Sequence, residues 1–151
     1  MNTNGKLCGL YLYPIKSCAP LKITEGSWPL SKTSMKYDRQ FVIMQGKSTL
    51  TQKNEPLLTQ IQPKIDLTKK IMTLSATWQS RNCQIFLQNF EKSSKMATND
   101  ITNNPEMVTK LCSGKVCGDI IEGYDCGDEV ADWLEETIGL TGTYIGSNKI
   151  K

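Results

Sequence analysis

The stretch RQFVIMQGKSTLTQ, residues 39–52, decides the fold class of this chain. Its apolar centre, Phe41-Val42-Ile43, combines aromatic and β-branched side chains, which strands favour. Gln45-Gly46-Lys47 then supplies a turn, and Ser48 to Gln52 runs back along the first segment. The stretch therefore predicts a β-hairpin.

Further strand-like segments lie on both sides of this hairpin. They share short length, β-forming composition and flanking turn residues. We expect strands at residues 6–15, 21–28, 65–67, 71–74, 83–87, 115–121 and 144–145. Thr68-Lys69-Lys70 separates two of these segments, so a second hairpin is predicted there.

Residues 128–138 have helical rather than strand-like spacing. Apolar side chains from Val130 to Ile138 recur at three- and four-residue intervals, and acidic side chains lie opposite them. We expect Asp125 to cap the start of this helix and Gly139 to end it. Trp133 lies on the apolar side and is expected to anchor the core.

The pattern as a whole predicts a mainly β (α+β) fold, a small β-barrel-like domain with one C-terminal amphipathic helix. Strands and helices do not alternate along the chain, which disfavours a doubly wound parallel sheet. The polar stretch 88–109 has weak periodicity and predicts a long flexible loop. A chain of 151 residues fits one domain, and we assign residues 1–151 to it.

The composition restricts the chemistry that the chain can perform. Histidine is absent, which excludes Ser-His-Asp and Cys-His catalysis and imidazole metal ligands. Cys112, Cys117 and Cys126 offer three thiolates, but no second tight pair or histidine completes a zinc tetrahedron. We therefore expect no metal site and no histidine-dependent catalysis in this chain, and reduced cysteines that act mostly as small hydrophobes.

The charge is distributed unevenly along the chain. Residues 1–70 carry a net charge of +7 and residues 71–151 one of −4, which together give the overall +3. The basic half suits an anionic partner, although lysines also solvate exposed strands and protect sheet edges. No apolar run reaches the roughly 18–20 residues of a membrane span, and residues 1–6 are polar, unlike a signal peptide. We expect a soluble, cytoplasmic protein without a membrane partner.

Three polar segments follow or open predicted strands and are candidates for binding an anion. In Tyr13-Pro14-Ile15-Lys16-Ser17-Cys18 a lysine and a serine occupy a turn, where both suit a phosphate. In Lys36-Tyr37-Asp38-Arg39 the arginine opens an apolar strand, and arginine matches phosphate oxygens as a fork. In Thr51 to Leu58, Lys53 extends the basic set, and Gln52 and Asn54 could hydrogen-bond a heterocycle. Each segment taken alone is also compatible with an ordinary surface turn.

In this order, the three segments resemble the MOSC N-terminal domain of molybdenum cofactor sulfurases. That family typically runs from Tyr-Pro-(Ile/Val)-Lys-Ser-Cys to an Asp-Arg before an apolar strand, and then to a turn that closes on Glu-Pro-x-Leu. The counterparts here are Tyr13 to Cys18, Asp38-Arg39 and Thr51 to Leu58. The segments 61–67 and 124–128, followed by the Trp133 helix, are similar to the eukaryotic sulfurases in particular.

The resemblance implies a molybdenum-cofactor-binding module in which Lys16, Ser17 and Arg39 hold the cofactor phosphate. It extends less firmly to Lys53 and Gln52, because an arginine is common where this chain has Lys53. The resemblance implies that this chain alone would carry no catalytic residue and would not be an enzyme by itself, whereas the parent protein would be a molybdenum cofactor sulfurtransferase. Its pyridoxal-phosphate-dependent cysteine desulfurase domain would precede this one, a MOSC domain would follow, and xanthine dehydrogenase and aldehyde oxidase would be activated.

Two other functions remain open from the residues themselves. The basic first half and its aromatic residues, Tyr11, Tyr13, Trp28, Tyr37 and Phe41, could form a small barrel that binds single-stranded nucleic acid. The spread of the basic residues and the pI of about 8.5 argue against this partner. The other alternative is a structural docking domain without a ligand.

Overall fold

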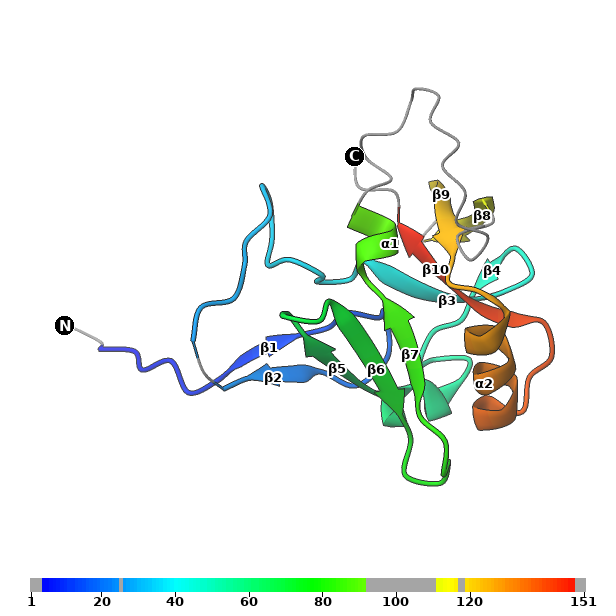
Figure 1. The fold of residues 1–151 in the computed structure, drawn as a ribbon, viewed down its shortest axis with the longest axis horizontal. Helices are drawn as coiled ribbons and strands as arrows, with labels where there is room; N and C mark the ends of the chain where they lie inside the picture. The colour runs from blue at the N-terminus through cyan, green and yellow to red at the C-terminus, as the bar shows by residue number, and fades with distance from the viewer. Residues whose placement is uncertain (1–3, 25, 92–110, 117–118, 149–151) are drawn as a thin grey trace.

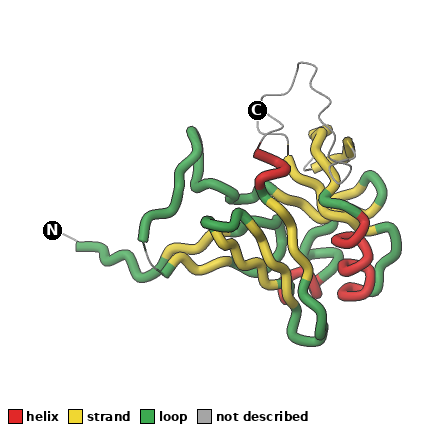
Figure 2. The backbone as a smooth tube through the Cα atoms, in the orientation of Figure 1, coloured by secondary structure: helices red, strands yellow, loops and turns green. Residues whose placement is uncertain are grey.

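The structure, a computed structural model, describes residues 4–24, 26–91, 111–116 and 119–148. Strands dominate this part of the chain (Figures 1 and 2). They are β1 Leu10–Leu12, β2 Leu21–Ile23, β3 Phe41–Gln45, β4 Ser48–Thr49, β5 Gln62–Asp66, β6 Ile71–Ser75, β7 Cys83–Phe86, β8 Leu111–Val116, β9 Asp119–Asp125 and β10 Thr143–Asn148. The helices are the 3-10 helix η1 Pro56–Gln60, α1 Gln88–Glu91 and α2 Asp128–Ile138.

Five of the strands close into a barrel in the order β10-β3-β4-β8-β9. The predicted hairpin of residues 39–52 is confirmed as β3 and β4, which pair antiparallel through Met44–Thr49 and Gln45–Ser48. Gly46 has a φ of 56° in the turn between them, a conformation that glycine adopts without steric cost. The mainly β, barrel-containing fold class predicted from the sequence is thus confirmed.

A three-stranded antiparallel sheet, β5-β6-β7, and the two-stranded sheet β1-β2 accompany the barrel (Figure 1). The hairpin predicted around residues 68–70 is confirmed by the pairing of β5 with β6. β5 begins earlier than predicted and includes Pro63, which is tolerated because β5 is an edge strand. β2 packs beside β5, so the two sheets adjoin.

One hydrophobic core joins these sheets to α2. Phe41 and Ile43 of β3 belong to it, together with Leu12, Met72 and Trp133. Trp133 is fully buried, as predicted, and its indole Nε1 donates a hydrogen bond to the carbonyl oxygen of Arg81 at 2.6 Å. Because α2 packs on both β10 and β7, the helix connects the barrel with the three-stranded sheet (Figure 1).

The prediction for α2 is confirmed at its C-terminal end and wrong at its N-terminal cap. Gly139 ends the helix in the left-handed conformation, with a φ of 73°, as predicted. Asp125 is not the cap, because two residues separate it from the helix and Gly127 occupies the N-cap position. The Asp125 carboxylate instead accepts a hydrogen bond from the amide of Gly127 at 2.9 Å, in a local turn.

Two other predictions were wrong in part. The single strand expected at 115–121 is two antiparallel strands, β8 and β9, whose last pair joins Val116 to Asp119. The apolar residues on both sides of Cys117-Gly118 look like one continuous run in the sequence, which hid the break. The loop predicted at 88–109 begins with the short helix α1, and the rest of it, 92–109, lies outside the described residues.

Candidate functional site

The first two candidate segments meet at the start of β3. Ile15 forms a parallel bridge with Phe41. The amide of Phe41 donates to the carbonyl oxygen of Pro14 at 3.0 Å, and the amide of Lys16 donates to the carbonyl oxygen of Phe41 at 2.9 Å. The lysine–serine turn and the arginine segment, far apart in sequence, are therefore held side by side through their backbones.

Asp38 and Arg39, which precede β3, continue this connection. The amide of Arg39 donates to the carbonyl oxygen of Tyr13 at 2.7 Å. The amide of Tyr13 donates in return to Oδ1 of Asp38 at 3.0 Å. The side chain of Asp38 thus connects the two segments.

Left-handed backbone conformations concentrate at this junction. Among the described residues other than glycine, a positive φ occurs at Ser17 (70°), Tyr37 (71°), Arg39 (49°) and Lys70 (55°). Such conformations cost of order 1–3 kcal/mol each and cluster at functional sites, where the surrounding structure enforces them. Three of these four strained positions lie in the two segments that the sequence singled out.

The lysine–serine turn leaves donors for an anion. The amides of Lys16 and Cys18 are bonded to backbone carbonyl oxygens, those of Phe41 and Ile15. The amide and hydroxyl of Ser17 make no hydrogen bond within the described part of the chain. Amides presented by a turn that changes hand are typical anion-binding groups, so the residues present fit a phosphate.

The residue before the third segment, Leu50, lies at the same edge of β3. The amide of Leu50 donates to the carbonyl oxygen of Ile43 at 2.9 Å. Because the carbonyl groups of alternate residues in a strand point to the same side, this oxygen lies on the same edge as the carbonyl oxygen of Phe41. Gln52 and Lys53 lie just beyond, both with exposed side chains. Asn54, which could hydrogen-bond a heterocycle, also closes its own turn, because its Oδ1 accepts from the amide of Thr51 at 2.7 Å.

Cys18, in the same motif, packs in the core. Its side chain is 4% exposed, and burial raises the pKa of its thiol to about 12. The thiol therefore stays protonated at neutral pH, and a protonated thiol is neither a nucleophile nor a metal ligand.

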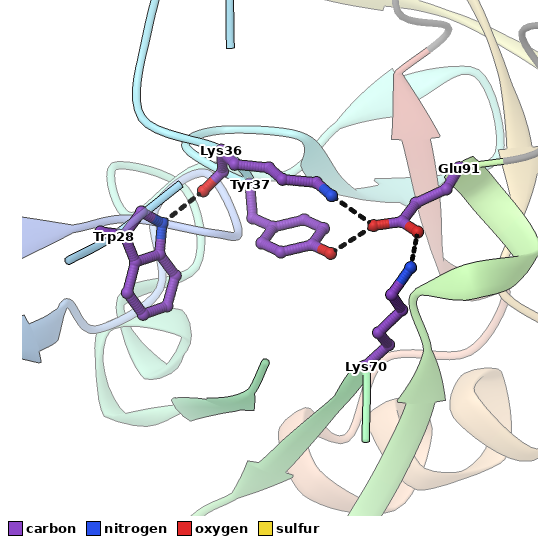
Figure 3. A network of polar contacts seen from close by, with 5 residues as sticks. All are labelled: Trp28, Lys36, Tyr37, Lys70 and Glu91. Atoms are coloured by element: carbon purple, nitrogen blue, oxygen red, sulfur yellow. Dashed lines mark hydrogen bonds and ion pairs between the residues drawn. The ribbon is translucent and has the colours of Figure 1, made fainter. Parts of the chain in front are cut away.

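Sequence reasoning missed one charged residue beside this site. Oε1 of Glu91 accepts from Nζ of Lys36 at 2.5 Å and from the hydroxyl of Tyr37 at 2.6 Å, and its Oε2 accepts from Nζ of Lys70 at 2.6 Å (Figure 3). Glu91 and Arg39 both line an open pocket of about 210 Å³. Glu91 lies within the polar stretch predicted as loop, where only the apolar Phe90 before it indicates an anchored turn.

Burial and hydrogen bonding act in opposite directions on the Glu91 carboxylate. Burial by itself would raise its pKa, but the hydrogen bonds from Lys36, Lys70 and Tyr37 outweigh it and lower the pKa to about 2. The pKa of Tyr37 is raised by burial and by the adjacent carboxylate. At neutral pH the cluster therefore holds an ionised carboxylate and a neutral phenol.

Comparisons with known proteins agree with this architecture. The family model described as the MOSC N-terminal beta barrel domain matches residues 4–141. Molybdenum cofactor sulfurases of Anopheles gambiae, Drosophila mojavensis and Homo sapiens are 34%, 39% and 34% identical over 138, 141 and 131 residues. These matches cover 91%, 91% and 86% of this chain but only 16%, 16% and 13% of the relatives, so the chain spans a small part of their length.

A solved structure supports the fold independently. The solution structure of a Bordetella bronchiseptica protein covers 98% of this chain, and 90% of its own, with a TM-score of 0.60 at 14% sequence identity. At that identity the likeness concerns the fold alone. The family match and the sequence relatives together show that the chain belongs to the MOSC N-terminal β-barrel domain family, with molybdenum cofactor sulfurases as its relatives.

Proposed function

We propose that this domain is the molybdenum-cofactor-binding module of a molybdenum cofactor sulfurase, and that Lys16, Ser17 and Arg39 hold the cofactor phosphate. The observation that carries this proposal is the set of backbone hydrogen bonds between the lysine–serine turn and the Asp38-Arg39 segment. They hold the backbones of Lys16, Ser17 and Arg39 close together, and this supports the proposal that their side chains meet one anion.

The chemistry of these groups suits a phosphate monoester, which carries about −1.5 to −2 charges at neutral pH. Each hydrogen bond from or to a charged group contributes roughly 1.5–3 kcal/mol. Arg39 can meet two phosphate oxygens at once, while Lys16 supplies a point charge. Gln52 and Lys53, which follow the same edge of β3, are proposed as outer contacts. When bound, the cofactor supplies the molybdenum chemistry, and the chain supplies its anchorage.

The remaining functions are proposed for the whole protein, since the chain spans only 13–16% of the relatives described above. We place a pyridoxal-phosphate-dependent cysteine desulfurase domain before this one and a MOSC domain after it, in a cytoplasmic sulfurtransferase. Xanthine dehydrogenase and aldehyde oxidase are the proposed recipients. No helix in the described part of this chain is long and apolar enough to cross a membrane.

The burial pattern argues against the nucleic-acid alternative. Tyr37 and Phe41, two of the aromatic residues that would stack on bases, are buried in the core. Tyr11 and Tyr13 are exposed and lie on or beside β1. A stacking platform needs several accessible ring faces along the strand of nucleic acid.

Cofactor retention by the full-length protein tests the proposal. Arg39→Ala and Lys16→Ala should each lower the molybdenum and pterin content of the purified protein by about tenfold or more, because each removes a charged hydrogen bond. Lys64→Ala, which removes an exposed lysine on β5, is the matched control and should load normally. If the two site variants retain as much cofactor as the control, the phosphate site is wrong and a docking domain without a ligand is favoured.

A further inference from the structure

We infer that Glu91 is a positioning residue for the proposed phosphate site, because it fixes the turn of residues 36–39 that presents Arg39. The inference rests on the proposed function for the identity of the ligand, but the contacts that support it are independent of any ligand. Figure 3 shows Lys36, Tyr37 and Lys70 directed at its carboxylate.

Glu91 holds two consecutive residues of this turn from a distant part of the chain. Its Oε1 bonds both Nζ of Lys36 and the hydroxyl of Tyr37, which lie 55 and 54 residues earlier. The side chain of Glu91 is 19% exposed, so these contacts are shielded from water more than a surface ion pair would be. The carboxylate therefore acts as a fixed point to which the turn is attached.

The turn needs such support because its backbone is strained. Tyr37 and Arg39 both adopt a left-handed conformation with only Asp38 between them. Other contacts define the two ends of the turn: the indole Nε1 of Trp28 donates to the carbonyl oxygen of Lys36 at 2.9 Å, and the amide of Arg39 donates to that of Tyr13. Glu91 is what holds the side chains of Lys36 and Tyr37 between those ends.

Glu91 itself is fixed from two directions. The ring of Phe90, its neighbour in α1, packs edge-on against Phe41 with centroids 5.6 Å apart. The backbone of Phe41 also binds the amide of Lys16. Phe41 of β3 therefore contacts both the lysine–serine turn and the residue next to Glu91. Lys70, just before β6, binds the second carboxylate oxygen and ties the three-stranded sheet to the cluster.

The charge of Glu91 and its proposed positioning role predict opposite effects on phosphate binding. A carboxylate near a phosphate site repels the phosphate, so its neutralisation should tighten binding if charge were its only role. Positioning predicts that neutralisation weakens binding, because the strained turn relaxes and Arg39 moves. The sign of the change in phosphate affinity therefore separates the two roles.

The experiment is a titration of the isotope-labelled 151-residue chain with inorganic phosphate, followed by NMR at the backbone amides of Lys16, Ser17 and Arg39. Glu91→Gln raises the net charge by one, and Lys70→Gln lowers it by one. Both variants should weaken phosphate binding by about fivefold, the equivalent of one lost hydrogen bond. Tyr37→Phe, which removes a single hydroxyl, should weaken binding by a smaller factor in the same direction.

Glu136→Gln is the control, because it removes a carboxylate on α2 that forms an exposed ion pair with Arg81. This variant should leave the phosphate affinity unchanged. Amide hydrogen exchange at Arg39 in the same samples reports the turn directly and should accelerate in Glu91→Gln but not in the control. If Glu91→Gln tightens phosphate binding while Lys70→Gln weakens it, or if neither variant changes it, the positioning role is refuted.

The two proposals can fail separately in this experiment. If phosphate does not change the NMR chemical shifts of these three amides in the unaltered chain, the proposed phosphate site is wrong. The hydrogen exchange of the Arg39 amide still decides the positioning role in that case, because acceleration in Glu91→Gln would support it and an unchanged rate would refute it.

Discussion

Ser17, Tyr37 and Arg39 show how single residues shape the proposed site. All three have positive φ values without being glycines, and all three lie where the first two motifs meet. The strain is offset by specific contacts, among them the Asp38 carboxylate on the amide of Tyr13. Replacement of such residues therefore changes the backbone conformation as well as the side chain.

Glu91 makes the stability of the domain depend on pH in the acid range. Its pKa is lowered from 4.5 to about 2 in the folded protein, so the stabilisation that it provides is complete above about pH 4.5 and is lost as the pH falls toward 2. The stability advantage of the unaltered chain over Glu91→Gln should shrink by roughly 2 kcal/mol between pH 7 and pH 3. Urea unfolding of both proteins at the two pH values measures this.

Glu136→Gln serves as the control for this measurement, because it also removes the carboxylate of an ion pair, in that case an exposed one. An advantage over Glu91→Gln that stays constant between pH 7 and pH 3 would contradict the assignment of a strongly stabilised carboxylate to Glu91.

At the residue scale the sequence predicted the groups that carry a motif and missed those that support it. Lys16, Ser17 and Arg39 belong to short patterns with local meaning, so they could be singled out before the structure was known. Glu91 could not, because its partners lie 21 to 55 residues away and no periodicity relates them. The role of Asn54 in closing its own turn was also missed, because the residue type alone does not distinguish an asparagine that closes a turn from one that binds a ligand.

Among the elements, β3 has the largest part in building the site. One edge of it binds the lysine–serine turn through Phe41, and it binds Leu50, the residue before the third segment, through Ile43. Its opposite edge pairs with β10 and so completes the barrel. The turns that carry the site are therefore hydrogen-bonded to a strand of the barrel, which favours a fixed geometry.

The glycine that ends α2 provides a test of the predicted C-terminal cap. Gly139 has a φ of 73°, which an alanine adopts only with strain. Gly139→Ala should lower the free energy of unfolding by about 1 kcal/mol and the melting temperature by roughly 2–4 °C. Asp132→Ala, at an exposed position within the helix, should change stability by less than about 0.5 kcal/mol. A stable Gly139→Ala variant would mean that the cap conformation is not required.

Element types were predictable where the local pattern was strong. The hairpins β3-β4 and β5-β6 and the helix α2 combine clear periodicity with turn residues, and all three were predicted. β8 and β9 were merged, because strand-forming residues continue through Cys117-Gly118 without a clear break. α1 was missed, since a single helical turn is too short to show a repeat.

At the scale of the whole molecule, three sheets and α2 share one core, and the proposed phosphate site lies where the barrel meets the β1–β2 ribbon (Figure 1). Phe41 contributes its ring to that core and its backbone to the site. The resemblance implied that the two segments converge, but the residues alone did not predict the parallel bridge between Ile15 and Phe41, because no local pattern relates the two positions. The central claim is thus that distant segments converge on one phosphate.

A double-mutant cycle on Lys16 and Arg39 measures that convergence most directly. Affinity for molybdopterin would be determined for the unaltered chain, Lys16→Ala, Arg39→Ala and the double variant, and again with dephosphorylated molybdopterin. We predict a coupling energy of about 1 kcal/mol or more with the phosphorylated ligand, because the two side chains contact the same phosphate, and none with the dephosphorylated one. Additive losses, or equal coupling with both ligands, would contradict the account.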